Sequence, residues 1–534
     1  MNKMKKYLKI LIVGVVIFSS SCMKDLDTIP LDDESITSEK IYQDPANYKL
    51  ALAKCYIGLA VGGNDGGDGD GDIVGIDGGF SQYLRLYWYS QELSTDEAII
   101  GWNDATIKDF HYQTWSTSDV FITAMYYRVM FQITLCNSFI KNSTPAKLED
   151  RGIGSEYYED IALYHAEARF LRALSYWHGL DLFRGIPYVT EDDPIGAWFP
   201  EQAKTPELFS KIESELIALT DGVGGDDLAD PNANEYGRAD KAAAWMLLAK
   251  LYLNAEVYLG EGNSKYTEAI TTLNKVISAG YSLESDFTNN FKADNDNSDE
   301  IIFPIAFDGT NTQTWGGTTI LVHAAIGGTM TAADYGVGGG WGGIRTTAQV
   351  VDKADIGNDT RAIFYTDGQN KEINDVSLFT DGYATPKFSN MTSTGEAGKN
   401  ADFVDTDFPV FRLADAYLMY AEAVLRGGTG GDASTALGYV NQLRERAYGN
   451  TSGNISSSEL DLDFILDERC RELYWEGHRR TDLVRFNKFT GDSYLWAWKG
   501  NLQAGRSTDS YRDVYPIPVD DLNANKNLTQ NDGY

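Results

Sequence analysis

Wide apolar helical faces constrain the fold of this chain more than any other feature of its sequence. Between residues 161 and 183 apolar side chains recur at helical spacing in two adjacent stripes, and Pro187 follows. Two adjacent stripes make a wide apolar face, which predicts a helix that is buried around most of its circumference. We therefore expect a helical scaffold with this helix in its interior.

Two helical pairs of similar design follow the buried helix. The first covers 242–258 and 266–279, and the second covers 411–425 and 433–447. The opening helix of each pair mixes alanine with aromatic residues, so a neighbouring helix can approach closely while a ring fills the groove. The pattern resembles tetratricopeptide-type hairpins, whose period is about 34 residues. Generic helical hairpins are the alternative.

The middle of the chain has a different composition. Residues 282–410 are rich in Gly, Asn, Asp and Thr, with short β-leaning runs at 301–307 and 318–322, and a second glycine-rich stretch covers 62–79. Long irregular segments in a compact domain are usually functional. The sequence thus predicts a mostly α fold with long irregular loops, a few short strands and ligand contacts in the loops.

The net charge limits the kinds of ligand that we expect, and the cysteine content argues against full disulfide pairing. The formal net charge of −33 repels phosphate backbones, so we expect no nucleic-acid partner, and a neutral ligand suits the surface better than an anion. Cys55, Cys136 and Cys470 are an odd set without a CxxC motif, and we expect buried free thiols.

The N-terminus has the pattern of a secretory signal over residues 1–21. Basic residues precede an apolar run at 10–18, which is shorter than the about 20 residues that span a bilayer. Cys22 at the cleavage point resembles a bacterial lipobox and would become the acylated first residue. Asp25 and Asp27 resemble the surface-export signal of Bacteroidetes lipoproteins. An ordinary signal peptide with an incidental Cys22 is the alternative.

The common catalytic signatures are missing from the sequence. It contains no HExxH, no GxSxG and no GxxxxGK[ST], and its five histidines have no metal-ligand spacing. We predict no organic cofactor. A glycosidase needs two carboxyls about 5–10 Å apart, a distance that sequence cannot give, so an enzyme of that class stays open.

Tryptophans in loop-like sequence are the more informative signal. Trp102, Trp315 and Trp341 stand beside Gly or Asn, where a large ring is hard to bury. Exposed aromatic faces stack well on the flat C–H faces of sugar rings. Structural tryptophans scattered through the fold are the alternative. Candidate polar partners for sugar hydroxyls are Arg85, Asn103 and Asp104.

Alternating acidic residues suggest a cation site. Asp294 and Asp296 alternate along one segment, and Asp405 and Asp407 alternate along another. Alternating oxygen side chains in a loop can wrap a hard cation such as Ca²⁺. Neither segment continues as an EF-hand, and a solvated acidic loop is the alternative.

Several blocks together resemble the SusD/RagB family of outer-membrane nutrient-binding lipoproteins, over nearly the whole mature chain. The blocks are 166–174, 465–469, 471–480, 482–486, 515–518 and 525–531. The arginines and carboxylates between 467 and 485 are predicted to form a structural charge network, not a catalytic site.

The resemblance implies a cell-surface glycan-binding lipoprotein with tetratricopeptide-like hairpins, which passes oligosaccharides to a SusC-type TonB-dependent transporter and is not an enzyme. It would be anchored to the outer membrane through Cys22. We expect one glycan-binding domain over 22–534, with its scaffold mainly in 35–280 and 411–490. The ligand region would lie within 62–115 and 282–410.

Within the family, the chain is similar to the starch-binding member. That similarity implies an α-glucan or malto-oligosaccharide ligand, with another glycan as the alternative. Ile100 replaces an aromatic residue, and Ala105 stands near an expected Asn, so the edge of the site differs. By the same similarity, the stacking residues are Trp102, Trp315 and Trp341, with Arg85 as a polar contact, and a structural Ca²⁺ is held by Asp296, Asp405 and Asp407.

Overall fold

The computed structural model describes residues 38–64, 66–67, 69–194, 196, 198–222 and 227–534. Over these residues the structure is mostly helical, and its strands form two short antiparallel pairs. The helices are α2 (Ser38–Ile41), α3 (Ala46–Ile57), α4 (Tyr83–Trp88), α5 (Lys108–Tyr112), α6 (Val120–Asn142), α7 (Pro145–Asp150), α8 (Tyr158–Phe183), α9 (Thr205–Ala218), α10 (Lys241–Leu253), α11 (Ala255–Leu259), α12 (Tyr266–Ile277), α13 (Gly317–Ala324), α14 (Ala348–Val351), α15 (Leu413–Leu425), α16 (Ala433–Tyr448), α17 (Leu462–Leu473), α18 (Arg479–Arg485) and α19 (Val519–Ala524).

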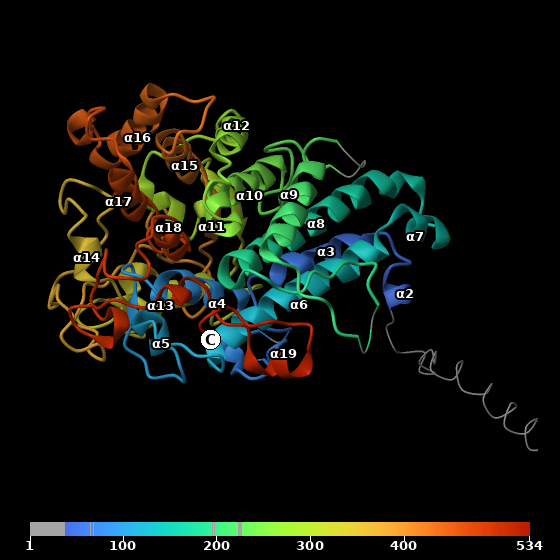
Figure 1. The fold of residues 1–534 in the computed structure, drawn as a ribbon, viewed down its shortest axis with the longest axis horizontal. Helices are drawn as coiled ribbons and strands as arrows, with labels where there is room; N and C mark the ends of the chain where they lie inside the picture. The colour runs from blue at the N-terminus through green and yellow to red at the C-terminus, as the bar shows by residue number, and fades with distance from the viewer. Residues whose placement is uncertain (1–37, 65, 68, 195, 197, 223–226) are drawn as a thin grey trace, which may run out of the picture.

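The helices form an elongated layer in which neighbours along the chain pack side by side. Figure 1 shows α3, α6, α7 and α8 toward one end of the molecule, and α14, α16 and α17 toward the other. The long helices α6 and α8 pack along each other, and α3 packs against both. This arrangement buries α8 from His165 onward almost completely, which confirms the predicted interior helix.

The predicted hairpins are confirmed as a stack. Helix α10 packs on α12, α12 packs on α15, and α15 packs on α16. Two boundaries differ from the prediction. The first helix is interrupted at Asn254, so it becomes α10 and α11, and the second hairpin begins at Leu413 because Phe411 lies in a strand.

Side-chain caps fix where several helices begin. The carboxylate of Asp119 accepts hydrogen bonds from the backbone N–H groups of the next turn, and Asp240 and Asp432 do the same at α10 and α16. Such caps satisfy donors that have no partner inside the helix, at about 1 kcal/mol each.

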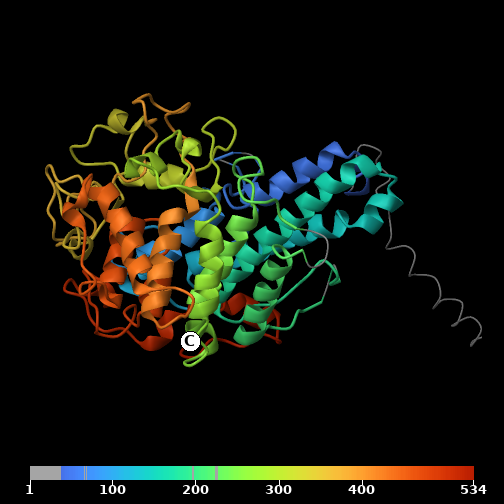
Figure 2. The same cartoon turned by 90° about the horizontal axis from the view of Figure 1, so that it is seen from above.

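Two strand pairs connect the loops to the helical scaffold. β2 (Ile301–Ile305) pairs with β4 (Phe408–Arg412), and β1 (Ile99–Ile100) pairs with β3 (Ile344–Arg345). The prediction of a strand at 301–307 is confirmed over most of its length. The loop-rich segment between β2 and β4 lies on one side of the helices, in yellow and gold in Figure 2.

The β-leaning interpretation of residues 318–322 was wrong. This run lies in α13, which is buried at every position from Gly317 to Ala324. A β-branched run has modest strand propensity, but complete burial among other elements overrides so weak a local preference.

The predicted charge network is confirmed, and its partners come from distant segments. Arg412 on β4 binds Glu300 and Glu472 at 2.7 Å each and Glu476 at 2.6 Å, all in the buried interior. Further pairs join Arg479 to Asp96, Arg480 to Asp181, Arg469 to Asp415 and Arg485 to Glu422. Removing one member would leave an uncompensated buried charge, which costs about 3–5 kcal/mol.

Cys55, Cys136 and Cys470 are buried free thiols, as predicted. In the described part of the chain, no helix is both long and apolar enough to cross a membrane. The predicted signal at 1–21 and the lipidated Cys22 lie outside the described residues.

Candidate functional site

Three tryptophans from distant parts of the chain come together on the loop-rich side. The ring centroid of Trp341 lies 6.3 Å from that of Trp102 and 5.9 Å from that of Trp315. The ring planes are inclined by 46° and 60°, so the three rings do not share one plane. All three are half-buried. We call this set the aromatic arc.

The β1–β3 pair places the first two rings of the arc. Trp102 follows β1 and Trp341 precedes β3, and the N–H of Gly101 donates to the carbonyl of Gly343 at 2.9 Å. The Trp102 ring lies directly over Gly343, where an added Cβ would be 2.3 Å from a ring carbon. A glycine is therefore required for this ring to lie where it does.

His323 on α13 supports the central ring. Its imidazole stacks on Trp341, and its two nitrogens face the carbonyl oxygens of Gly339 at 2.6 Å and of Asp402 at 3.0 Å. Burial lowers the pKa of His323. His323 was not among the predicted site residues, because the contact joins segments that no spacing pattern connects.

Arg85 fixes the backbone that carries the third ring. Its guanidinium donates to the carbonyl oxygens of Trp315 at 2.9 Å and Gly79 at 2.6 Å, and it lies 4.3 Å from the Phe80 ring centroid. The side chain is only 4 % exposed. The structure thus brings Arg85 to the arc, where it fixes the Trp315 backbone and the end of the 62–79 loop.

The other predicted polar residues lie at the rim. Asn103 and Asp104 are exposed and directly follow Trp102, so their side chains are free to meet a ligand on that ring. Ala105 has a positive φ of 39°, which turns the chain back toward α5. Ile100 is fully buried, so its departure from the family pattern does not change the surface of the arc.

Phe403 is a fourth ring at the site, and it was not predicted from the sequence. Its centroid lies 4.5 Å from that of Trp315, with ring planes 43° apart, and the side chain is half-buried. An added Cβ at Gly67 would be 2.9 Å from Phe403 and 3.0 Å from the Trp315 indole nitrogen. The only feature of the sequence that could have indicated Phe403 is that it is an aromatic residue in an acidic loop.

The predicted metal-binding carboxylates anchor the segment that leads to Trp315. Asp407 accepts the backbone N–H of Phe307 at 2.7 Å, and Asp405 accepts that of Gly309 at 2.9 Å. Both residues are buried, whereas Asp296 is exposed.

The same carboxylates concentrate negative charge. Burial raises the pKa of Asp407 to about 7, and the charges of Asp296 and Asp405 act in the same direction. In the described ranges, no three His, Cys, Asp or Glu side chains lie close enough together to hold a metal ion. The oxygen-only chemistry suits Ca²⁺, whose other ligands would have to be main-chain oxygens and water.

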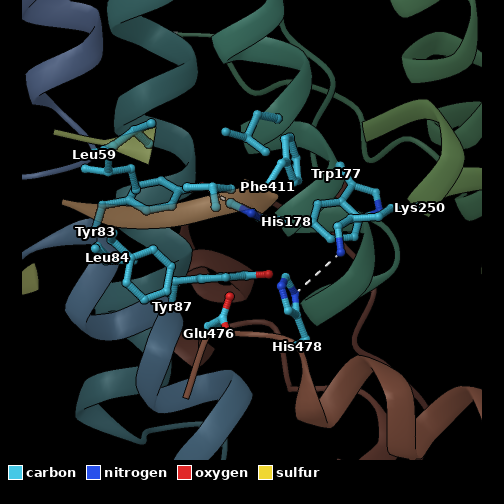
Figure 3. A pocket seen from close by; sticks show the side chains of 14 residues that line it. Leu59, Tyr83, Leu84, Tyr87, Trp177, His178, Lys250, Phe411, Glu476 and His478 are labelled. Carbon is cyan, nitrogen blue, oxygen red and sulfur yellow. Dashed lines mark hydrogen bonds between the residues drawn. The ribbon is translucent and has the colours of Figure 1, made fainter. Parts of the chain in front are cut away.

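A buried cavity elsewhere in the fold is too small for a substrate. Figure 3 shows Tyr87, His178, Lys250, Glu476 and His478 around it, and its volume is about 20 Å³. A space of this size holds a single water molecule. Burial lowers the pKa of His178 to about 3, so this histidine is neutral and structural.

Comparisons with known proteins agree with the architecture. A profile described as the SusD family matches residues 358–534. The starch-binding protein SusD of Bacteroides thetaiotaomicron is 36% identical, with 99% of each chain covered. SusD-like protein P2 of Formosa agariphila is 27% identical over 72% of this chain and 77% of its own length.

Solved structures share the fold. A SusD superfamily protein from Parabacteroides distasonis matches with a TM-score of 0.70 and 22% identity, over 94% of this chain and 100% of its own. Surface glycan-binding protein A from Bacteroides thetaiotaomicron, solved in complex with laminarihexaose, matches with a TM-score of 0.67 and 20% identity, over 91% and 99%.

Proposed function

This chain belongs to the SusD family, and from that premise we propose that it binds a glycan on the aromatic arc. The observation that carries the proposal is the convergence of Trp102, Trp341 and Trp315 into one half-buried surface. Flat apolar ring faces stack on the C–H faces of pyranose rings, and exposed Asn103 and Asp104 at the rim supply partners for hydroxyl groups.

The ligand class that we propose is α-glucan, as starch or malto-oligosaccharides. The 36% identity to a starch-binding relative over the full length supports it. The successive inclination of the three rings also supports a curved ligand, because a flat ribbon-like glycan would meet only one ring face at a time. A different glycan on the same arc is the second candidate, since a structural neighbour was solved with laminarihexaose.

The activity that we propose is capture without cleavage. A glycoside hydrolase would need two carboxyls flanking the bound sugar, about 5–10 Å apart. Asp405 and Asp407, at the base of the segment that leads to Trp315, are engaged with backbone N–H groups. New reducing ends after incubation of the purified protein with amylose would contradict this part of the proposal.

The cellular role that we propose is delivery of glycan to a SusC-like TonB-dependent transporter at the cell surface. Acylated Cys22 would attach the protein to the outer membrane. The N-terminal sequence pattern supports this anchoring. We also propose a structural Ca²⁺ at Asp296, Asp405 and Asp407, which would steady the segment that leads to Trp315. Because these three side chains do not lie close enough together in this structure to hold an ion, its binding would have to draw them together.

The ligand class is tested by native gel electrophoresis with polysaccharide in the gel. We expect amylopectin and pullulan to retard the protein and laminarin and dextran to leave its migration unchanged. Retardation by laminarin alone would contradict the α-glucan proposal and favour the second candidate.

A further inference from the structure

Two hollows on the exposed side of α3 adjoin each other along the helix. The first, of about 290 Å³, lies between α3, β2 and the turn at Tyr236, and the second, of about 380 Å³, lies between α3 and residues 310–313. Ala53 and Ile57, one helical turn apart, line both hollows. We call the two hollows together the α3 groove.

The α3 groove begins where the aromatic arc ends. Gln313 lines the groove and stands two residues before Trp315. Gly66 also lines the groove, and the next residue, Gly67, packs against Trp315 and Phe403. The half-buried Phe403 ring extends the arc in this direction, so the aromatic surface and the groove meet at one loop.

Over its described residues, the groove lacks acidic side chains in a strongly acidic protein. Of the described residues that line it, none is Asp or Glu, although the chain has 78 acidic residues. Its cations are compensated by carboxylates outside the lining. The pairs are Lys49 with Glu235, Arg238 with Glu167, and Lys54 with Asp72. A neutral ligand therefore meets no unpaired charge there.

The polar groups of the groove suit sugar hydroxyls. Asn64, Asn311 and Gln313 offer amides, each with both donor and acceptor capacity. Apolar side chains from α3 form the floor, and Tyr236, 46 % exposed, stands at the far end with its hydroxyl fixed to Asp407 at 2.7 Å. An apolar floor with an amide rim matches the apolar faces and polar edge of a pyranose chain.

We propose that the glycan-binding surface continues past Trp315, through Phe403, into the α3 groove, which holds the distal sugar units of a long neutral glycan. This extension rests on the proposed function. The arc alone would bind short oligosaccharides, whereas long chains would gain affinity from the groove.

The test compares maltotetraose with short-chain amylose by isothermal titration calorimetry. Ala53→Trp fills the groove from an exposed position of α3, and Ala46→Trp places the same ring at an exposed α3 position outside the lining. We expect Ala53→Trp to weaken amylose binding about tenfold, which corresponds to about 1.4 kcal/mol, and to leave maltotetraose binding unchanged. Ala46→Trp should change neither affinity.

A second variant keeps the groove open. Asn311→Ala combined with Gln313→Ala removes two amides without adding bulk. This double variant should also weaken amylose binding relative to maltotetraose binding.

The alternative outcomes separate the two proposals. If the wild-type protein binds both ligands equally, or if Ala53→Trp keeps the gain for amylose, the surface ends at the arc and the extension is wrong while the proposed function stands. If neither ligand binds, the proposed α-glucan function fails and the extension fails with it. Loss of a dimer in Ala53→Trp, seen by sedimentation, would assign the groove to a second copy of this chain instead.

Discussion

The indole ring of Trp341 stacks on the imidazole ring of His323, with ring centroids 4.6 Å apart and ring planes 15° from parallel. The contact matters because Trp341 is the central ring of the arc, and a ring backed by a rigid partner loses little freedom when a ligand stacks on it. His323 is in turn fixed by two backbone carbonyl oxygens, to which a neutral imidazole donates from one nitrogen at a time. We therefore regard His323 as a positioning residue.

Replacing His323 should weaken glycan binding without any loss of a ligand contact. We expect His323→Ala to cost about 2 kcal/mol of stability, because it opens a cavity, and to weaken maltoheptaose binding severalfold because Trp341 loses its support. His323→Phe keeps a ring behind Trp341 and should lose less affinity. Calorimetry and thermal melting measure both effects.

A buried histidine far from the arc provides the control for His323. His165→Ala on α8 should lower stability and leave affinity unchanged. Full maltoheptaose affinity in His323→Ala would show that the stack has no positioning role.

The glycine under Trp102 gives a sharper test of ring placement. Gly343→Ala puts a Cβ 2.3 Å from the Trp102 ring and must displace it, whereas Gly339→Ala meets nothing within 4 Å. We expect Gly343→Ala to weaken maltoheptaose binding about tenfold, near 1.4 kcal/mol, and Gly339→Ala to bind like the wild type. Equal affinities measured by calorimetry would mean that the position of Trp102 is not critical.

A buried carboxyl pair should make stability fall as pH rises. Glu92 and Glu97 interact in the buried interior, and they accept backbone N–H groups of Trp475, Gly477 and His478. Burial raises the pKa of Glu97 to about 7 and that of Glu92 well above 4.5. For Glu97, the positive charge of Arg479 acts in the opposite direction, and the negative charge of Asp96 adds to the rise. The folded state thus holds protons that the unfolded state releases.

The sign follows from this linkage. The stabilising contribution of the pair is complete below about pH 4.5 and is lost as pH rises through about 7 and beyond. Glu92→Gln keeps a donor toward Glu97 without a proton to lose. We expect the free energy of unfolding of this variant to increase relative to that of the wild type as pH rises. Urea denaturation from pH 5 to 9 measures it. A difference in unfolding free energy between variant and wild type that stays constant from pH 5 to 9 would contradict the retention of protons by this pair.

The proposed Ca²⁺ site should appear as a stability effect. After treatment with EDTA, addition of Ca²⁺ should raise the melting temperature by several degrees, and Mg²⁺ should not, because it needs a tighter octahedral site. Asp407→Asn should abolish the response, while Asp294→Asn, outside the proposed ligand set, should keep it. No response to Ca²⁺ in the wild type would remove the proposal.

Features that depend on neighbouring residues could be predicted from the sequence, whereas contacts between residues far apart in the sequence could not. The helical scaffold follows from local periodicity, and the three tryptophans were identified because each is flanked by Gly or Asn. The stack of His323 on Trp341 and the pairing of Phe403 with Trp315 join segments far apart in sequence, which no local pattern reports. Residues 318–322 were misassigned because tertiary burial, not propensity, decides the state of a short apolar run.

The same limit applies to polar residues. Arg85 was predicted at the site because of its residue type and the family resemblance. Its donation to the backbone carbonyls of Trp315 and Gly79 depends on how the 62–79 loop returns to α4.

Calorimetry with maltoheptaose decides whether the aromatic arc binds the glycan. We expect Trp102→Ala, and Trp315→Ala combined with Trp341→Ala, to abolish binding while circular dichroism and melting show an intact fold. Trp245→Ala, a half-buried tryptophan on α10, should bind normally. Wild-type affinity in the arc variants would contradict the account.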